Sequence, residues 1–120
     1  MEFIEGFKIK YGYDLEDFEF KEFDLGDAHG REYIDSDGKP VAKLTVTDSI
    51  IANVFVYTHY RGYGLSYQLL DVAMDEYGLD TLTVDINNKV AIHAYESYGF
   101  KILYGNGSMY TMKFKGISVR

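Results

Sequence analysis

A strand, a glycine turn and a helix follow one another directly between residues 50 and 77, and this succession constrains the fold more than any other feature of the sequence. Residues 50–57 are rich in β-branched and aromatic side chains, which predicts a buried strand. From Leu65 onwards the apolar residues recur at helical spacing, and Gly78 is placed to end the helix in a left-handed conformation. The segment therefore predicts a sheet with a helix packed on it.

Two hairpins flank this segment. Residues 31–46 predict two strands around the turn Asp37-Gly38, and residues 100–114 predict two more around Gly105-Asn106-Gly107. Pro40, the single proline, follows the first of these turns.

A further strand and a short helix lie between the long helix and the second hairpin. Residues 81–86 alternate in polarity as a strand does, and Asn88 is placed to cap a helix that Gly99 ends. The predicted apolar face of this helix consists of Val90, Ala91, Ala94, Tyr95 and Tyr98. The order of elements predicts an α+β (mixed α/β) fold in which helices pack on a mixed sheet.

The first forty residues are harder to interpret. Residues 1–13 and 19–25 resemble strands, but the spacing of Phe18, Phe20 and Phe23 also fits the edge of a helix. The 120 residues are too few for two ordinary domains, so we expect one domain over residues 1–120.

Acidic residues are concentrated in the same N-terminal third. Residues 1–40 carry 12 acidic and 5 basic side chains, whereas residues 41–120 carry 7 of each, so this third accounts for the net charge of -7. A binding surface for nucleic acid needs clustered Lys and Arg, which the sequence lacks. The run from Asp14 to Phe20 is either a solvated face that favours solubility or a surface that attracts a cationic partner.

Residue usage excludes several other classes. The chain has no cysteine and only three histidines, at 29, 59 and 93, so thiolate chemistry is excluded and a metal site is disfavoured. No apolar run approaches the roughly 20 residues of a membrane helix, and the N-terminus lacks a signal pattern. We expect a cytoplasmic protein, monomeric or homodimeric, that binds neither membrane nor nucleic acid.

The turn between the predicted strand and helix, Tyr60-Arg61-Gly62-Tyr63-Gly64-Leu65-Ser66, has the composition of an anion site. Its glycines leave backbone N–H groups accessible, and the helix N-terminus adds a partial positive charge, so the turn is suited to a diphosphate. It is neither a Walker loop nor a three-glycine dinucleotide fingerprint, and an ordinary turn remains an alternative.

A second motif, in order and in register with the first, gives the chain a family resemblance. Residues 54–66 resemble the acetyl-CoA segment of the GNAT superfamily of N-acetyltransferases, with its pattern Q/R-x-x-G-x-G/A. Asn88-Lys89-Val90-Ala91, followed by Tyr95 and then by Gly99-Phe100, is similar to the second signature of that family. The resemblance covers about residues 41–114 and implies a mostly antiparallel mixed sheet that splays apart at the cofactor site.

The resemblance also implies roles for individual residues. Backbone groups of Val54, Phe55 and Val56 would bind the pantetheine arm, and Asn88 would hold it through its amide. Tyr95 matches the position of the hydroxyl that protonates the departing thiolate, although a core aromatic is the alternative. The pyrophosphate would lie in the turn formed by Arg61, Gly62, Tyr63, Gly64, Leu65 and Ser66.

The implied activity is direct transfer of an acetyl group from acetyl-CoA to a primary amine, borne by a small molecule or a protein. No covalent nucleophile is evident, which agrees with transfer in a ternary complex without a metal. A main-chain N–H near Val56 would stabilise the developing oxyanion. The alternatives are a CoA-binding module without catalysis and an acidic module that occupies a basic partner.

The sequence departs from the family in three places. Ser66 stands in place of a final Gly or Ala, and Ile50 and Thr83 stand where members often carry a glutamate base. We therefore take Asp85, on the same strand face as Thr83, as the general base. The alternatives are that Asp85 only caps the turn at Asn87 and that His59, His93 or water acts as the base.

The third departure is the short acidic region of residues 1–40, where the family usually supplies two helices and a loop as the acceptor wall. We expect this region to lie on the side from which a cationic amine approaches.

Overall fold

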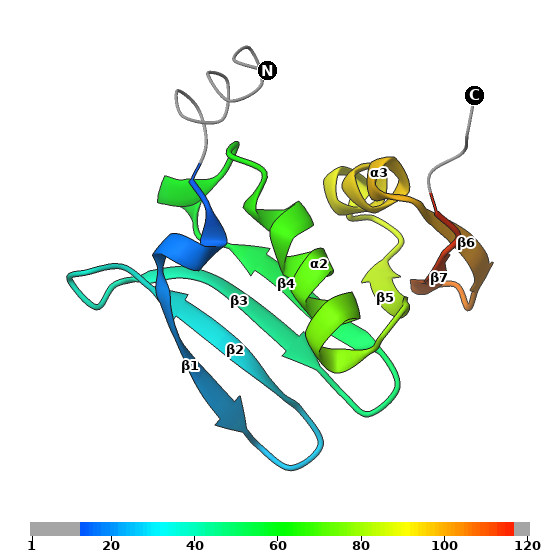
Figure 1. Cartoon of the computed structure of the whole chain (residues 1–120). Coiled ribbons are helices and arrows are strands. Elements are labelled where there is room, and N and C mark those ends of the chain that lie inside the picture. The colour runs from blue at the N-terminus through cyan, green and yellow to red at the C-terminus, as the bar shows by residue number, and fades with distance from the viewer. Residues whose placement is uncertain (1–12, 117–120) are drawn as a thin grey trace.

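The computed structural model describes residues 13–116, so all but the last residue of the strand predicted for residues 1–13 lies outside the described range. Seven strands form one sheet in the order β1-β2-β3-β4-β5-β7-β6 (Figure 1). Every pair of neighbouring strands is antiparallel except β4 and β5, which are parallel. The strands are β1 (Glu19–Asp24), β2 (His29–Ile34), β3 (Pro40–Val46), β4 (Ile51–Val56), β5 (Thr81–Asp85), β6 (Phe100–Gly105) and β7 (Met109–Phe114).

The predicted mixed sheet and its two hairpins are confirmed. Ile34 and Pro40 bracket the first turn, in which Asp35 Oδ1 accepts hydrogen bonds from the N–H groups of Asp37 and Lys39. The sequence of residues 19–25 fits both a strand and the edge of a helix, and in the structure Glu19–Asp24 is a strand. Before it, Leu15–Asp17 forms the short 3-10 helix η1.

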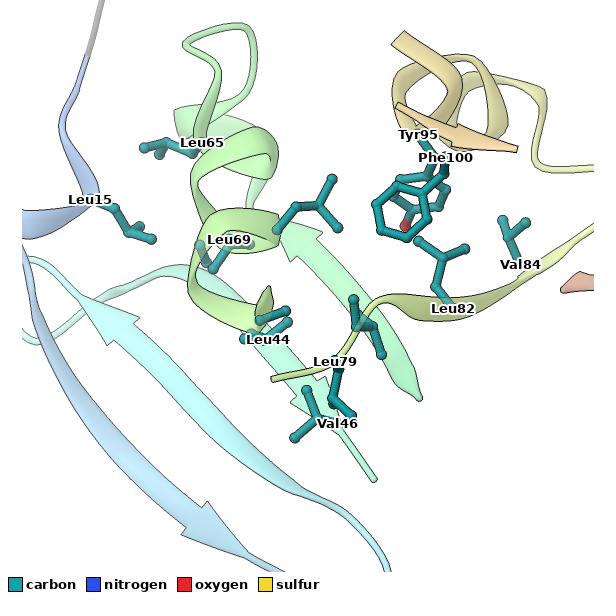
Figure 2. Packing of buried hydrophobic residues seen from close by; sticks show 14 of the residues in the cluster. Leu15, Leu44, Val46, Leu65, Leu69, Leu79, Leu82, Val84, Tyr95 and Phe100 are labelled. Atoms are coloured by element: carbon teal, nitrogen blue, oxygen red, sulfur yellow. The ribbon is translucent and has the colours of Figure 1, made fainter. Parts of the chain in front are cut away.

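Helix α2 (Leu65–Tyr77) packs on the sheet as its apolar spacing predicts. Leu65, Leu69, Leu70 and Ala73 are buried, and Gly78 ends the helix with a φ of 67°. Figure 2 shows Leu65 and Leu69 pointing from this helix toward the core that also contains Leu44 of β3. Burial of these aliphatic side chains, each contributing about 1.5–3 kcal/mol, holds the helix on one face of the sheet.

Gln68 ties the N-terminal segment to α2. Its Oε1 accepts a hydrogen bond from Leu15 N–H at 2.7 Å, and its Nε2 donates to the Tyr13 carbonyl at 3.1 Å. The ring of Tyr13 packs edge-on against Tyr60 and Tyr63. The segment from Tyr13 to Phe18 therefore lies against α2 and the short 3-10 helix η2 (Thr58–Tyr60).

Helix α3 (Lys89–Tyr98) packs beside β6, and its buried face differs in part from the predicted one. The buried residues are Ile92 and Tyr95, whereas Val90 is 83% exposed. The prediction that Val90 belongs to the buried face is wrong because the core lies under positions 92, 95 and 99, and Val90 in the first turn faces a cavity instead. Gly99 ends the helix as predicted.

Strand β4 exists where predicted, but the prediction that it is buried is wrong. Only Ile51 at its start is buried, and Ala52, Asn53 and Phe55 are exposed. The physical reason is that the helices cover one face of the sheet, so Asn53 and Phe55 on the other face are open to solvent, and most of one edge of β4 also lacks a neighbouring strand.

Candidate active site

A gap between β4 and β5 lies at the centre of the sheet. These parallel neighbours share a single Cα pair, Ile51 with Leu82, after which they diverge (Figure 1). On their outer sides both strands are fully paired, β4 with β3 and β5 with β7. The gap therefore exposes main-chain groups of β4 that an ordinary sheet would pair.

The direction of these groups follows from the register of β3 and β4. Tyr57 N–H donates to the Val41 carbonyl at 2.9 Å, and hydrogen-bonded pairs alternate along an antiparallel ladder. The main chain of Phe55, which is paired with Lys43, therefore bonds to β3. Val54 and Val56 turn their N–H and carbonyl groups into the gap.

A cavity of about 490 Å³ opens beside the gap on the side of the two helices. The predicted cofactor residues Val54, Phe55, Val56, Arg61, Gly62, Gly64, Leu65, Ser66 and Asn88 line it, together with Tyr95. Of the predicted cofactor residues, Tyr63 is absent from this lining, and its ring packs against Tyr13.

The glycine turn exposes its backbone to this cavity. Gly62 and Gly64 have φ values of 88° and 81°, and no atom lies within 4 Å of the position that a Cβ would occupy at either residue. Gly64 precedes α2 directly, so the unpaired N–H groups of the first turn of the helix point toward the same space. A negatively charged group of a ligand fits this arrangement.

Arg61 connects the turn to the end of β4. Its Nε donates a hydrogen bond to the Val56 carbonyl at 2.7 Å, and its guanidinium carbon stands 5.4 Å from the centre of the Phe55 ring. The Val56 carbonyl is therefore already occupied. The Val54 N–H, the Val54 carbonyl and the Val56 N–H remain for a ligand in the gap.

Helix α3 supplies the two polar side chains of the second motif. Asn88 caps the helix, with its Oδ1 accepting a hydrogen bond from Ala91 N–H at 3.2 Å, which leaves its Nδ2 as a donor. Tyr95 is 8% exposed, and burial raises the pKa of its phenol above the ordinary value of 10. Tyr95 is therefore a protonated hydroxyl at neutral pH.

A second, smaller cavity of about 200 Å³ adjoins the first one at the gap. It shares five lining residues with the first cavity: Val54, Phe55, Asn88, Ala91 and Tyr95. The remaining lining residues are Ile51, Ala52, Asn53, Thr83, Val84, Asp85 and Met109. Tyr95 thus stands where the two cavities meet.

Among the residues that line this smaller cavity, Asp85 carries a formal charge. Its Oδ1 accepts a hydrogen bond from Asn87 N–H at 2.8 Å, so the carboxylate caps the turn before α3. A carboxylate has a second oxygen with free acceptor capacity, and the two roles are compatible.

Other predicted groups lie away from the gap. His59 and His93 are exposed and line neither cavity. None of residues 13–40 lines either cavity, and the expectation that the acidic region lies on the side from which the amine approaches stays a prediction. Asp14 and Glu16 instead line a separate groove with Asp71, Asp75 and Glu76, because Gln68 holds this segment on the far side of α2.

Several lining residues were not predicted from the sequence, among them Asn53, Ala94 and Met109. Alternation along β4 could have placed Asn53 with Phe55 on one face. Met109 enters through its pairing with Asp85 on β5, which no local pattern reveals. Within residues 13–116 no group of three His, Asp or Glu is arranged to hold a metal ion, and no helix is long and apolar enough to cross a membrane.

Comparisons with known proteins agree with this geometry. A sequence model of the acetyltransferase (GNAT) family matches residues 2–100. The fold is similar to that of nourseothricin acetyltransferase, with 22% identity, a TM-score of 0.60, and coverage of 82% of this chain and 84% of that chain.

Two further structures share the fold over about two thirds of their own length. PH1933 from Pyrococcus horikoshii OT3 is 24% identical with a TM-score of 0.62, covering 73% of this chain and 66% of that chain. PseH, an N-acetyltransferase of Campylobacter jejuni in complex with acetyl coenzyme A, is 16% identical with a TM-score of 0.55, covering 72% and 67%. No curated protein sequence gives a significant match.

Proposed function

Because this chain belongs to the acetyltransferase (GNAT) family, whose members use acetyl-CoA, we propose that it transfers an acetyl group from acetyl-CoA to a primary amine by direct attack in a ternary complex. We take residues 1–120 as one catalytic domain. The observation that supports this function best is the gap between β4 and β5, with two adjoining cavities and Tyr95 at their junction.

The larger cavity is the proposed cofactor site. The Val54 N–H, the Val54 carbonyl and the Val56 N–H bond the pantetheine arm as an added strand would, and Asn88 Nδ2 donates a further hydrogen bond. The N–H groups between Gly62 and Ser66 receive the pyrophosphate. This assignment needs no displacement of the Arg61 side chain, because the carbonyl that Arg61 occupies is left out of the ladder.

The smaller cavity is the proposed acceptor site. Asp85 takes a proton from the ammonium group of the acceptor, so that the neutral amine can attack the acetyl carbonyl. As the carbon–nitrogen bond forms and the carbon–sulfur bond breaks, Tyr95 donates its proton to the departing sulfur; the nitrogen then gives up its second proton, which restores Tyr95, and Asp85 releases the first proton to solvent. Burial raises the pKa of Tyr95, so its hydroxyl is protonated at neutral pH and available as a donor to the sulfur.

The absence of cysteine makes the test direct. A thiol reagent added to the reaction reports only the thiol released from acetyl-CoA, and mass spectrometry identifies the acetylated amine. We expect wild-type protein to release thiol in the presence of an amine, and Tyr95→Phe to lower kcat about 100-fold while acetyl-CoA binding by calorimetry stays unchanged.

Tyr104→Phe is the matched control, since Tyr104 is 62% exposed on β6 and lines neither cavity. Binding of acetyl-CoA without acetylation of any amine would instead favour the CoA-binding module. Unchanged turnover in Tyr95→Phe would remove Tyr95 from the reaction.

A further inference from the structure

The side chain of Phe55 stands on the face of the sheet opposite the helices. Val54 and Val56 pack against the core, and side chains alternate along a strand, so Phe55 and Asn53 point to the other face. Phe55 is 38% exposed and lies outside the core cluster. A large aromatic side chain is thus displayed at the edge of the gap.

Strand β5 presents the opposite wall on the same face. Leu82 and Val84 are buried beneath the helices, so the alternating residues Thr83 and Asp85 point to the face of Phe55. Phe55, Thr83 and Asp85 line the same cavity of about 200 Å³. A ring on one wall therefore faces a carboxylate on the other.

Neighbouring side chains hold the Phe55 ring in place. The ring of Tyr57 packs perpendicular to it, with centroids 5.0 Å apart and an interplanar angle of 90°. Arg61, fixed by its hydrogen bond to Val56, places its guanidinium over the ring. These contacts limit how far the ring can turn to enlarge the cavity.

The charge and the size of the cavity restrict what it can take. Asp85 gives the lining a formal negative charge, and an aromatic face attracts a cation as well as an alkyl chain. Sites that enclose drug-sized ligands measure roughly 300–1,000 Å³. A cavity of about 200 Å³ lies below that range, so it takes the amine-bearing end of an acceptor rather than a whole drug-sized molecule.

We propose that Phe55 and Asp85 form an acceptor site that selects a primary ammonium group at the end of an apolar alkyl stem. The stem lies along the Phe55 ring and the ammonium group meets Asp85. A lysyl side chain and a linear polyamine both present this chemistry, whereas an amino sugar presents hydroxyl groups where the methylene carbons would pack on the ring. This inference rests on the proposed function. It assigns the side chain of Phe55 to binding of the acceptor.

The test measures binding, so it does not depend on turnover. Protein saturated with CoA is titrated by calorimetry with n-hexylamine, glucosamine, spermidine and a short peptide that contains one lysine. We expect n-hexylamine to bind at least about tenfold more tightly than glucosamine, because the hydroxyl groups of the sugar would be desolvated against the Phe55 ring. Spermidine and the peptide distinguish the two sources of the stem, and tight binding of either one supports the site.

Variants of Phe55 locate the site. Phe55→Ala should weaken n-hexylamine binding about tenfold, the loss expected for one cation–π contact and its apolar surface, when it is measured at a CoA concentration that saturates the variant. Phe55→Tyr, which keeps the ring, should bind like wild type. The matched control is Phe23→Ala, since Phe23 lines neither cavity.

Three results would overturn the proposal: equal binding of n-hexylamine and glucosamine, no effect of Phe55→Ala, or no binding of any probe. A different result would contradict the proposed function: amines and acetyl-CoA both bind, but no acetyl group is transferred.

Discussion

Replacing Tyr98 by phenylalanine should remove one hydrogen bond between the helices and little else. The Tyr98 hydroxyl donates to Asp71 Oδ1 and so links α3 to α2. The Tyr98 ring packs on Phe100 and Phe114 at centroid distances of 5.9 and 5.6 Å, and a phenylalanine ring preserves these contacts.

The expected magnitude follows from the type of bond and its surroundings. A hydrogen bond to a charged group contributes about 1.5–3 kcal/mol, and this pair lies in an exposed position that weakens it. We therefore expect Tyr98→Phe to lower the free energy of unfolding by about 1 kcal/mol, which corresponds to a loss of about 4 °C in Tm.

Urea unfolding of a double-mutant cycle isolates the pair. The cycle combines Tyr98→Phe and Asp71→Ala, and we expect a coupling of about 1 kcal/mol between them. A coupling below about 0.3 kcal/mol, the usual error of additivity, would refute this reasoning.

The pair also predicts a pH dependence. Burial, and then the bond to Asp71, raise the pKa of Tyr98 well above its ordinary value of 10. Because the folded pKa exceeds the unfolded one, the stabilisation is complete below about pH 10 and is lost as the pH rises further. The stability difference between wild type and Tyr98→Phe should therefore be constant from about pH 7 to 9 and shrink above about pH 10.

Three further substitutions test other parts of the structure. Gly64→Ala should lower the free energy of unfolding by about 1–2 kcal/mol, because residue 64 has a left-handed conformation. Gly64→Glu should in addition lower the affinity for CoA more than about tenfold, because its carboxylate repels phosphate. Equal CoA binding by the two variants would argue against a phosphate site. Gly30→Ala should prevent folding or cost more than about 3 kcal/mol, as its Cβ would lie 1.9 Å from the Leu44 carbonyl oxygen, and circular dichroism would detect the loss. Four acidic residues line neither cavity, namely Asp14, Glu16, Asp17 and Glu19. Neutralising them should change the KM of the acceptor at low salt less than twofold. A larger rise in KM would indicate that the acidic region contributes to acceptor binding.

Local patterns in the sequence predicted most of the elements of this fold. The strands, the two hairpin turns and the ends of α2 and α3 depend on neighbouring residues, and Gly78 and Gly99 end the helices where their conformational freedom is needed. The two glycine-containing motifs likewise predicted most of the residues that line the larger cavity, although Tyr63 is absent from the lining. Each of these features is encoded within a short stretch of chain.

The errors concern burial, which, like placement, depends on distant parts of the chain. The composition of β4 indicates a core strand, but its exposure depends on which face the helices cover and on the divergence of β5, which comes 25 residues after β4 ends. Val90 and Ile92 are equally apolar, and only the position of α3 over the sheet decides which one is buried. The acidic segment lies where Gln68 holds it, a contact across 53 residues that no pattern predicts.

The single pairing between β4 and β5 also makes the stability of the protein depend on its ligand. The two halves of the sheet are joined mainly by side-chain packing beneath the helices, because the ladder that would join them is missing. A ligand bonded to β4 within the gap supplies part of that ladder and binds only the folded chain. By linkage it stabilises the fold by about 2.7 kcal/mol at a concentration of 100 times its Kd. The melting temperature would then rise with the concentration of the cofactor, and the resistance of the chain to unfolding would follow its supply of acetyl-CoA.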